Sequence, residues 1–384
     1  MSIYAFAEVE EGKAKRIYAS ARYPSRQAGN VFCDADELIC SEDSPLKIKG
    51  PYAFVAFKAR YVLASRDVLG SRPLYYSPEE FAFSSFKSYF DGEAIELMPG
   101  EVLKLNYDGS IEERKFYSFH DVFRKEEAST DELVERIEKS LETFKPSASC
   151  LAFSGGVDSS LLAAMYDVQL ISVTASREEE EHVKRAAKLL NKDIEIFRFG
   201  EREVREALPE VIKTIETTNP LQVSIGVPIY LAMKFAKSLG YSRIIFGQGA
   251  DELFGGYKRY ESLSHEELEN ALISDVKNIG KNNLVRDVKL SYRTEMKILT
   301  PYLQWDVISA AISIPTDMKV KRENNKVVRK YILRQIAKKY IPNELAYRDK
   351  KAVQYSTKTT KILEKLAKQA GMGLDEYLVD FKRQ

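Results

Sequence analysis

The sequence predicts an α/β protein with two domains. A small antiparallel β-rich domain is followed by a domain with a parallel sheet that has helices on both faces. Three observations support this fold class. A chain of 384 residues has room for two domains, and 44% hydrophobic residues can fill large cores. Strand-like runs dominate the first 120 residues, whereas strand-like and helix-like segments alternate after about residue 130.

The predicted first domain spans residues 1–120. Its strand candidates are short runs rich in β-branched and aromatic residues, separated by turn signals such as Pro99-Gly100 and Asp108-Gly109. These runs are residues 52–57, 60–65, 73–77, 81–85 and 101–106. Residues 121–130 are polar and aperiodic, which predicts a linker.

The predicted second domain spans residues 131–384 and begins with a helix. Ser129 and Glu132 have the spacing of a capping box, and apolar residues follow at helical intervals. Predicted strands are 149–153, 169–176, 193–199 and 242–247, and predicted helices between them are 177–190, about 203–217 and about 226–239. This order predicts a parallel sheet with ligands at the carboxyl ends of its strands, and the chain after about residue 258 is mainly helical.

Charge and composition exclude several classes of protein. The chain holds 58 Lys and Arg against 57 Asp and Glu, which gives a net charge of +1. We therefore do not expect a protein whose whole surface binds nucleic acid or an acidic membrane. No apolar run is long enough to span a membrane and no secretory signal opens the chain, so we expect a cytoplasmic protein. Three cysteines and three histidines lack metal-ligand spacing.

The first chemical motif is SGGVDSS at residues 154–160, between a predicted buried strand and a helix. Its glycines let backbone amides approach an anion at a helix N-terminus, and its serines add hydroxyl donors. The candidate phosphate-binding residues are Ser154, Gly155, Gly156, Ser159 and Ser160. Asp158 would repel a bare phosphate, which predicts a bridging divalent cation. The alternative is a glycine turn with a capping side chain.

The second motif is GQGADELFGGY at residues 247–257, again after a predicted strand. It lacks the third glycine of a dinucleotide fingerprint, because Glu252 stands there. Asp251 is therefore predicted to be a second magnesium ligand, facing Asp158 across a nucleotide. A polar turn before a helix is the alternative interpretation.

Together these motifs resemble known proteins. SGGVDSS resembles the pyrophosphate loop of N-type ATP pyrophosphatases, and with the second motif it resembles the synthetase domain of the asparagine synthetase family. The likeness runs over about residues 130–357. Further matching segments are Pro228–Leu231, Thr300–Leu303, Lys330–Arg334 (a K-x-x-L-R helix) and Arg348–Lys350 (an R-x-K segment).

The N-terminal domain resembles the family's glutaminase domain, a small N-terminal nucleophile-like fold, only in its second half. Residues 66–76 are close to the family's R-D-x-x-G-x-x-P-L-Y-Y pattern. Ser2 stands where the family has a nucleophilic cysteine, and the glutamine-binding segments are missing. We therefore expect a truncated, inactive glutaminase-like domain.

The resemblance implies an AMP-forming carbon–nitrogen ligase that uses ATP and Mg²⁺. It would join aspartate or a related small carboxylate to ammonia or another amine through an acyl-adenylate, releasing AMP and pyrophosphate. The implied nucleotide-binding residues are Ser154, Gly155, Gly156, Asp158, Ser159, Ser160, Val173 and Gly247. The implied magnesium ligands are Asp158 and Asp251, and the implied catalytic residues are Lys350 and Gln248. Gln248 is neutral where asparagine synthetases carry a glutamate. A homodimer is left open.

Two alternatives compete with this interpretation. Residues 319–351 carry a net charge of +9, which would suit an RNA-modifying enzyme of the same ATP-loop class. An apolar stripe in this segment instead predicts that most of its cations line the solvated face of one helix. A non-catalytic nucleotide-binding paralogue is the other alternative.

Overall fold

The computed structural model describes residues 3–21, 26–323, 326–348 and 357–383. The chain divides into two compact units. The first comprises Met1–Arg124 with Lys277–Glu295, and the second comprises Lys125–Val276 with Met296–Gln384. The sequence placed residues 277–295 in the second domain, but the structure groups them with the first unit.

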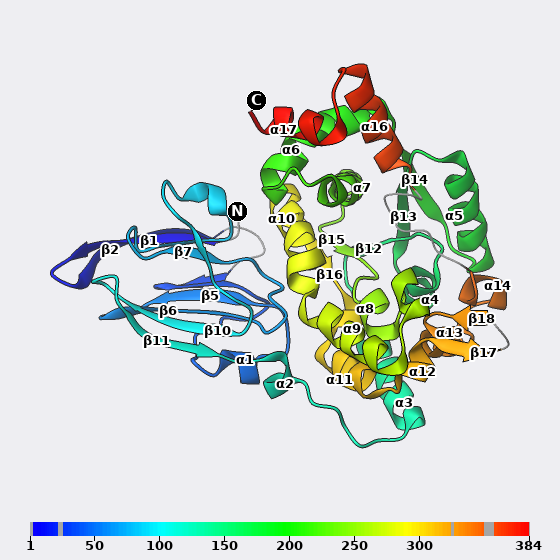
Figure 1. Ribbon diagram of the computed structural model, residues 1–384, viewed down its shortest axis with the longest axis horizontal. Coiled ribbons are helices and arrows are strands. Elements are labelled where there is room, and N and C mark those ends of the chain that lie inside the picture. The colour runs from blue at the N-terminus through cyan, green and yellow to red at the C-terminus, as the bar shows by residue number, and fades with distance from the viewer. Residues whose placement is uncertain (1–2, 22–25, 324–325, 349–356, 384) are drawn as a thin grey trace. The chain divides into compact units, whose positions relative to one another are not determined.

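The first unit is rich in antiparallel strands, as predicted, and these strands form two sheets (Figure 1). Across one sheet the strands are β2 (Lys13–Ala21), β1 (Ile3–Glu10), β8 (Ala82–Ser84), β7 (Tyr75–Ser77) and β9 (Ile95–Glu96). Across the other they are β11 (Ile111–Phe116), β10 (Glu101–Asn106), β6 (Tyr61–Arg66), β5 (Ala53–Phe57), β4 (Val31–Asp34) and β3 (Arg26–Ala28). Short helices accompany them: α1 (Ser44–Lys47), η1 (Lys87–Tyr89) and α2 (Phe119–Val122).

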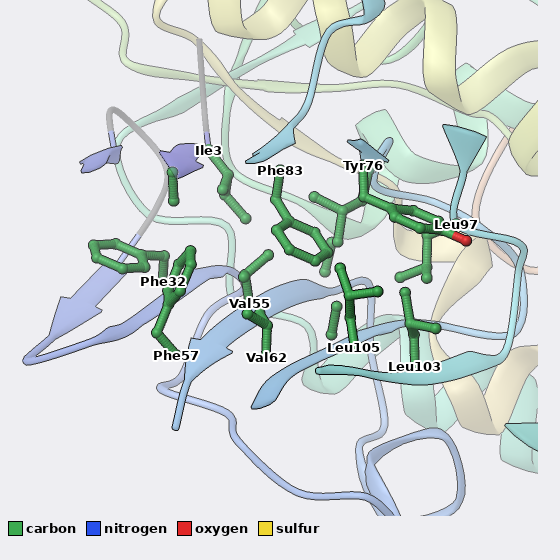
Figure 2. Packing of buried hydrophobic residues seen from close by; sticks show 14 of the residues in the cluster. Ile3, Phe32, Val55, Phe57, Val62, Tyr76, Phe83, Leu97, Leu103 and Leu105 are labelled. Atoms are coloured by element: carbon green, nitrogen blue, oxygen red, sulfur yellow. The ribbon is translucent and has the colours of Figure 1, made fainter. Parts of the chain in front are cut away.

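The core of the first unit is made by apolar side chains from both sheets (Figure 2). Ile3 and Phe83 come from one sheet, and Val55, Val62 and Leu103 come from the other. Alternate residues of β1 (Ile3, Ala5 and Ala7) and of β5 (Ala53, Val55 and Phe57) belong to this core, which is the pattern that strand periodicity predicts for two packed sheets.

Residues 277–295 are fixed to the first unit by polar contacts as well as packing. They form a π-helical turn (η3, Gly280–Leu284) and α10 (Val285–Thr294). Tyr292 of α10 donates its hydroxyl to the buried carboxylate of Asp34. The ammonium of Lys289 lies 4.9 Å from the ring centre of Tyr75. A Cβ added to Gly280 would lie 2.0 Å from the carbonyl oxygen of Leu69, so only glycine fits there.

The second unit is built on a parallel five-stranded sheet, which confirms the predicted fold class (Figure 1). Across the sheet the strands are β14 (Ile194–Arg198), β13 (Gln169–Thr174), β12 (Ser149–Ala152), β15 (Arg243–Ile245) and β16 (Lys297–Leu299). All neighbouring pairs in it are parallel. The sequence analysis did not predict β16, because three residues give too short a pattern to separate a strand from its helical surroundings.

One helix precedes the sheet, and the others alternate with its strands as predicted. They are α3 (Thr130–Thr143), α4 (Val157–Met165), α5 (Arg177–Leu189), α6 (Glu201–Ile215), α7 (Pro220–Ser238) and α8 (Ala250–Phe254). The predicted capping box of Ser129 and Glu132 is confirmed at the start of α3. The helix predicted from about residue 226 begins earlier, because Pro220 takes the first helical position and the Asn219 side chain caps it.

The rest of the second unit is mainly helical. Its elements are η2 (Lys258–Ser262), α9 (His265–Lys277), η4 (Pro301–Leu303), α11 (Trp305–Ser313), α12 (Thr316–Lys319), a hairpin of β17 (Lys321–Glu323) and β18 (Lys326–Val328), α13 (Tyr331–Ala337), α14 (Asn343–Ala346), α16 (Thr359–Gln369) and α17 (Leu374–Arg383). None of the described helices combines the length and apolar character needed to cross a membrane.

Tyr292→Phe tests the contact that fixes α10. Removing the hydroxyl takes a donor from the buried Asp34 carboxylate, which should lower the free energy of unfolding by about 1–3 kcal/mol. Chemical denaturation followed by near-UV circular dichroism measures the change. Tyr18→Phe is the control, since that hydroxyl meets Glu8 at the exposed surface. Equal stability of both variants would contradict the described packing of α10.

Candidate active site

The SGGVDSS loop connects the central strand β12 to α4, as the sequence predicted. Gly155 has φ 65°, a left-handed conformation that favours glycine. A Cβ added there would lie 2.3 Å from Nε2 of His182 on α5. The chain therefore makes its tight turn where a neighbouring helix leaves no room for a side chain.

Hydroxyl groups hold the loop in this shape. Ser159 Oγ accepts a hydrogen bond from the backbone N–H of Ser154 at 3.2 Å and lies 3.2 Å from Ser154 Oγ. It also donates to the carbonyl of Gly156 at 3.3 Å. Ser160 Oγ is buried and finds no hydrogen-bond partner among the described residues.

The second motif connects β15, the neighbour of β12, to the short helix α8. Gly249 (φ 90°) begins this helix and Gly255 (φ 75°) ends it. Asp251 is partly exposed, whereas Glu252 is buried and accepts a hydrogen bond from the Tyr257 hydroxyl at 2.5 Å. Burial, and then the nearby Asp251 carboxylate, raise the pKa of Glu252. The two adjacent acidic side chains therefore differ in their surroundings: Asp251 is partly accessible to solvent, whereas Glu252 is held in the protein interior.

One ammonium group joins the two motifs. Lys330 Nζ lies 2.7 and 2.8 Å from the two carboxylate oxygens of Asp158 and 2.6 Å from Oδ1 of Asp251. The side chains of Lys330 and Asp158 are only 5% and 2% exposed. Asp158 and Asp251, which were predicted to face each other across a nucleotide, therefore both contact the same positively charged group.

Surrounding groups fix Lys330 in place. It has φ 54°, a left-handed conformation that is costly for any residue but glycine, and it begins α13. The preceding Arg329 donates to the carbonyl of Gly256 at 2.7 Å. The buried Arg334 donates to the Arg329 carbonyl at 2.7 Å and to the Ala346 carbonyl at 2.6 Å. Such over-determined strain is typical of functional sites.

Gly256 lies directly against this ionic contact. A Cβ added to it would lie 1.9 Å from Oδ1 of Asp251 and 2.2 Å from Cε of Lys330. Gly247 is similarly close to Asp158, since its added Cβ would lie 3.2 Å from the Asp158 Cβ. The glycines of the second motif therefore let backbone and charged groups approach one another.

The other predicted site residues have the following positions. Val173 lies near the carboxyl end of β13, which pairs with β12 on the side away from β15. Gln248 is partly buried in the loop before α8. Lys350 and Ser2 lie outside the described residues. The sequence does not predict Lys330 as a site residue, although its place in the K-x-x-L-R segment is a signal that could have identified it.

The residues present fit a nucleotide bound with a divalent cation. Two carboxylates already hold a positive charge between them, and the buried Ser160 hydroxyl in the first turns of α4 has no hydrogen-bond partner among the residues that the structure describes. No group of three or more His, Cys, Asp or Glu side chains suited to a metal occurs in the described part of the chain. Further ligands would therefore come from phosphate oxygens and water, which is typical of Mg²⁺.

A cavity of about 300 Å³ lies between α5 and the segment that contains α14. Its lining includes His182, Arg185 and Arg348. Burial, and then the positive charge of Arg348, lower the pKa of His182 to about 4. The imidazole that lies against Gly155 is consequently neutral at physiological pH.

The structure contradicts the prediction that most cations of segment 319–351 line the solvated face of one helix. Its described residues form the end of α12, the β17–β18 hairpin, α13 and α14. Lys319, Lys330 and Arg334 are buried. Burial lowers the pKa of Lys319 to about 7. Helical periodicity missed this arrangement because the hairpin interrupts the segment.

The fold and the two loops define a class of protein. A parallel sheet whose central strand ends in a glycine-rich loop at a helix N-terminus, beside a strand that ends in an acidic loop, is typical of ATP-binding PP-loop proteins. The family model for asparagine synthase matches residues 129–269 and 261–377. The chain belongs to the asparagine synthase family, which confirms the resemblance seen in the sequence.

Individual relatives agree with this assignment. A protein described as putative asparagine synthetase 1 (glutamine-hydrolysing) of Methanocaldococcus jannaschii is 30% identical over 96% of this chain and 81% of that protein. An asparagine synthetase of Asparagus officinalis is 27% identical over 80% of this chain but only 58% of its own length. A protein described as a predicted subunit of tRNA methyltransferase from Methanocaldococcus jannaschii covers 59% of this chain and 89% of its own at 16% identity, with a TM-score of 0.28.

Gly256→Ala tests the close approach at the ionic contact. The added methyl group must displace Asp251 or Lys330, which should lower the free energy of unfolding by about 1–3 kcal/mol. Gly373→Ala is the matched control because nothing lies within 4 Å of its added Cβ. Denaturant midpoints measure both. A Gly256→Ala protein as stable as the control would contradict the geometry.

His182→Asn tests the neutral imidazole. A pKa lowered from 6.5 to about 4 means that the unfolded chain binds more protons in this window, so His182 costs stability as the pH falls from 6.5 to 4. The variant should show a shallower loss of unfolding free energy over this range. Denaturation curves at half-unit pH steps measure the slope, and an unchanged slope would show that His182 titrates normally.

Proposed function

We propose that the chain is an ATP-dependent ligase that forms an amide through an acyl-adenylate and releases AMP and pyrophosphate. One observation carries the proposal. Asp158 in a glycine-rich anion loop and Asp251 in the neighbouring loop converge on one buried cation position, within a chain of the asparagine synthase family.

The first loop would bind the phosphates of ATP. The backbone amides of residues 154–156 and the hydroxyls of Ser159 and Ser160 are suited to pyrophosphate oxygens at the N-terminus of α4. Val173 on β13 and Gly247 in the loop after β15 follow the two strands that flank β12, and they would contact the nucleoside through backbone atoms.

Asp158 and Asp251 would hold Mg²⁺ together with phosphate oxygens. When bound, Mg²⁺ neutralises charge that develops on the phosphates during transfer. The chain's own contribution is to place two carboxylates within reach of one position and to exclude water from Asp158, whose side chain is 2% exposed. Lys350 would stabilise negative charge on the α-phosphate and the leaving pyrophosphate.

The reaction would run in two steps. An oxygen of the substrate carboxylate bonds to the α-phosphorus as the bond from that phosphorus to pyrophosphate breaks. An amine then attacks the acyl carbon, loses a proton, and expels AMP to leave an amide. Both steps concentrate negative charge where backbone N–H groups and cations can meet it.

The acceptor would be a small carboxylate and the nitrogen source ammonia or another amine. Gln248 is neutral, so it would orient a substrate by hydrogen bonding and would not act as a base. Aspartate is one candidate acceptor among related carboxylates. We expect no glutaminase activity, because Ser2 takes the place of the family's cysteine and the glutamine-holding segments are missing.

Exchange of radiolabelled pyrophosphate into ATP tests this proposal. Purified protein with Mg²⁺ and a panel of amino acids should show exchange that depends on one carboxylate. Ammonia, but not glutamine, should then convert exchange into AMP release. Asp158→Asn should lower the exchange rate by about 10²-fold or more, because a stabilising charge at the phosphates is lost.

Asp167→Asn is the matched control for that substitution. Asp167 is a fully exposed carboxylate just beyond the C-terminus of α4, so its variant should exchange at the wild-type rate. No carboxylate-dependent exchange across the panel, with ATP bound, would contradict the ligase proposal and favour a non-catalytic nucleotide-binding protein.

A further inference from the structure

The buried ammonium of Lys330 takes the position expected of a metal cation. It lies within 2.8 Å of three carboxylate oxygens from two different residues, Asp158 and Asp251. The ammonium therefore occupies the place between the two carboxylates where a divalent cation would bind.

Local backbone features hold the Lys330 ammonium close to the two carboxylates. Lys330 begins α13 in a left-handed conformation, and Gly256 offers no side chain that would separate it from Asp251. Arg329 and the buried Arg334 fix the backbone on either side. A lysine on a free surface would gain little from such contacts, because exposed ion pairs contribute little.

A metal ion and this ammonium cannot share the position. Two cations a few ångströms apart in a poorly solvated site repel one another strongly. Mg²⁺ can bind both carboxylates only if the Lys330 ammonium moves away, and a buried ammonium needs a new anionic partner. Phosphate oxygens above the first loop would supply that partner.

We propose that Lys330 is an exchangeable counter-ion that competes with the divalent cation for Asp158 and Asp251. The metal then binds tightly only together with nucleotide phosphates, which receive the displaced ammonium. Lys330 thus couples loading of metal to loading of nucleotide. This inference rests on the proposed nucleotide site.

Binding of Mn²⁺, used as a paramagnetic substitute for Mg²⁺, tests the competition. Electron paramagnetic resonance reports free Mn²⁺ with and without a non-hydrolysable ATP analogue. Wild-type protein should bind Mn²⁺ at least tenfold more tightly with the analogue than without it. Lys330→Met should bind Mn²⁺ alone at least tenfold more tightly than wild type does. Lys339→Met, which removes a half-exposed ammonium that pairs with Glu138, should match wild type.

The outcomes separate this inference from the function on which it rests. Equal affinity of wild type and Lys330→Met for Mn²⁺ alone would overturn the competition, although the analogue still binds. If the variant does not fold, wild-type protein decides, because equal Mn²⁺ affinity with and without the analogue would also overturn it. Failure of the analogue to bind wild type at all would instead contradict the proposed function.

Discussion

The contact of the Lys330 ammonium with the Asp158 and Asp251 carboxylates is the interaction on which the site depends. These residues come from three segments that are far apart in the chain, two of them following neighbouring strands of one parallel sheet. Taking the Lys330 ammonium away would remove the cation that the buried Asp158 carboxylate and the partly exposed Asp251 carboxylate share, and a buried carboxylate that loses its cation is strongly unfavourable. The contact therefore links the first loop, the second loop and the start of α13 into one structure.

Several unusual local features are explained by this contact. Gly256 and Gly247 lack side chains where a Cβ would approach one of the carboxylates, and Lys330 adopts a backbone conformation that favours glycine. Taken alone, the left-handed backbone of Lys330 costs free energy and the two glycines have no evident purpose. Together they bring charges close enough to form a cation-binding position beside a loop suited to phosphates. Membership of the asparagine synthase family and this geometry lead to the same proposal of ATP-dependent ligation.

Much of the fold and of both loops could be predicted from the sequence, because their signals are local. Strand periodicity, the paired glycines and the capping box of Ser129 and Glu132 each depend on residues close in the chain. Contacts between distant segments could not be predicted in this way. Lys330 is 172 residues from Asp158, and a helical stripe does not reveal its partner, so neither its burial nor the grouping of α10 with the first unit was foreseen. The predicted roles of Lys350 and Ser2 concern residues outside the described structure and stay predictions.

A crystal structure with Mg²⁺ and a non-hydrolysable ATP analogue tests the central claim most directly. The account predicts that the analogue's phosphates lie over residues 154–160, that the metal contacts Asp158 and Asp251, and that the Lys330 ammonium has left both carboxylates for a phosphate oxygen. A structure in which the analogue binds elsewhere, or in which Lys330 still bridges both carboxylates beside bound phosphates, would contradict it.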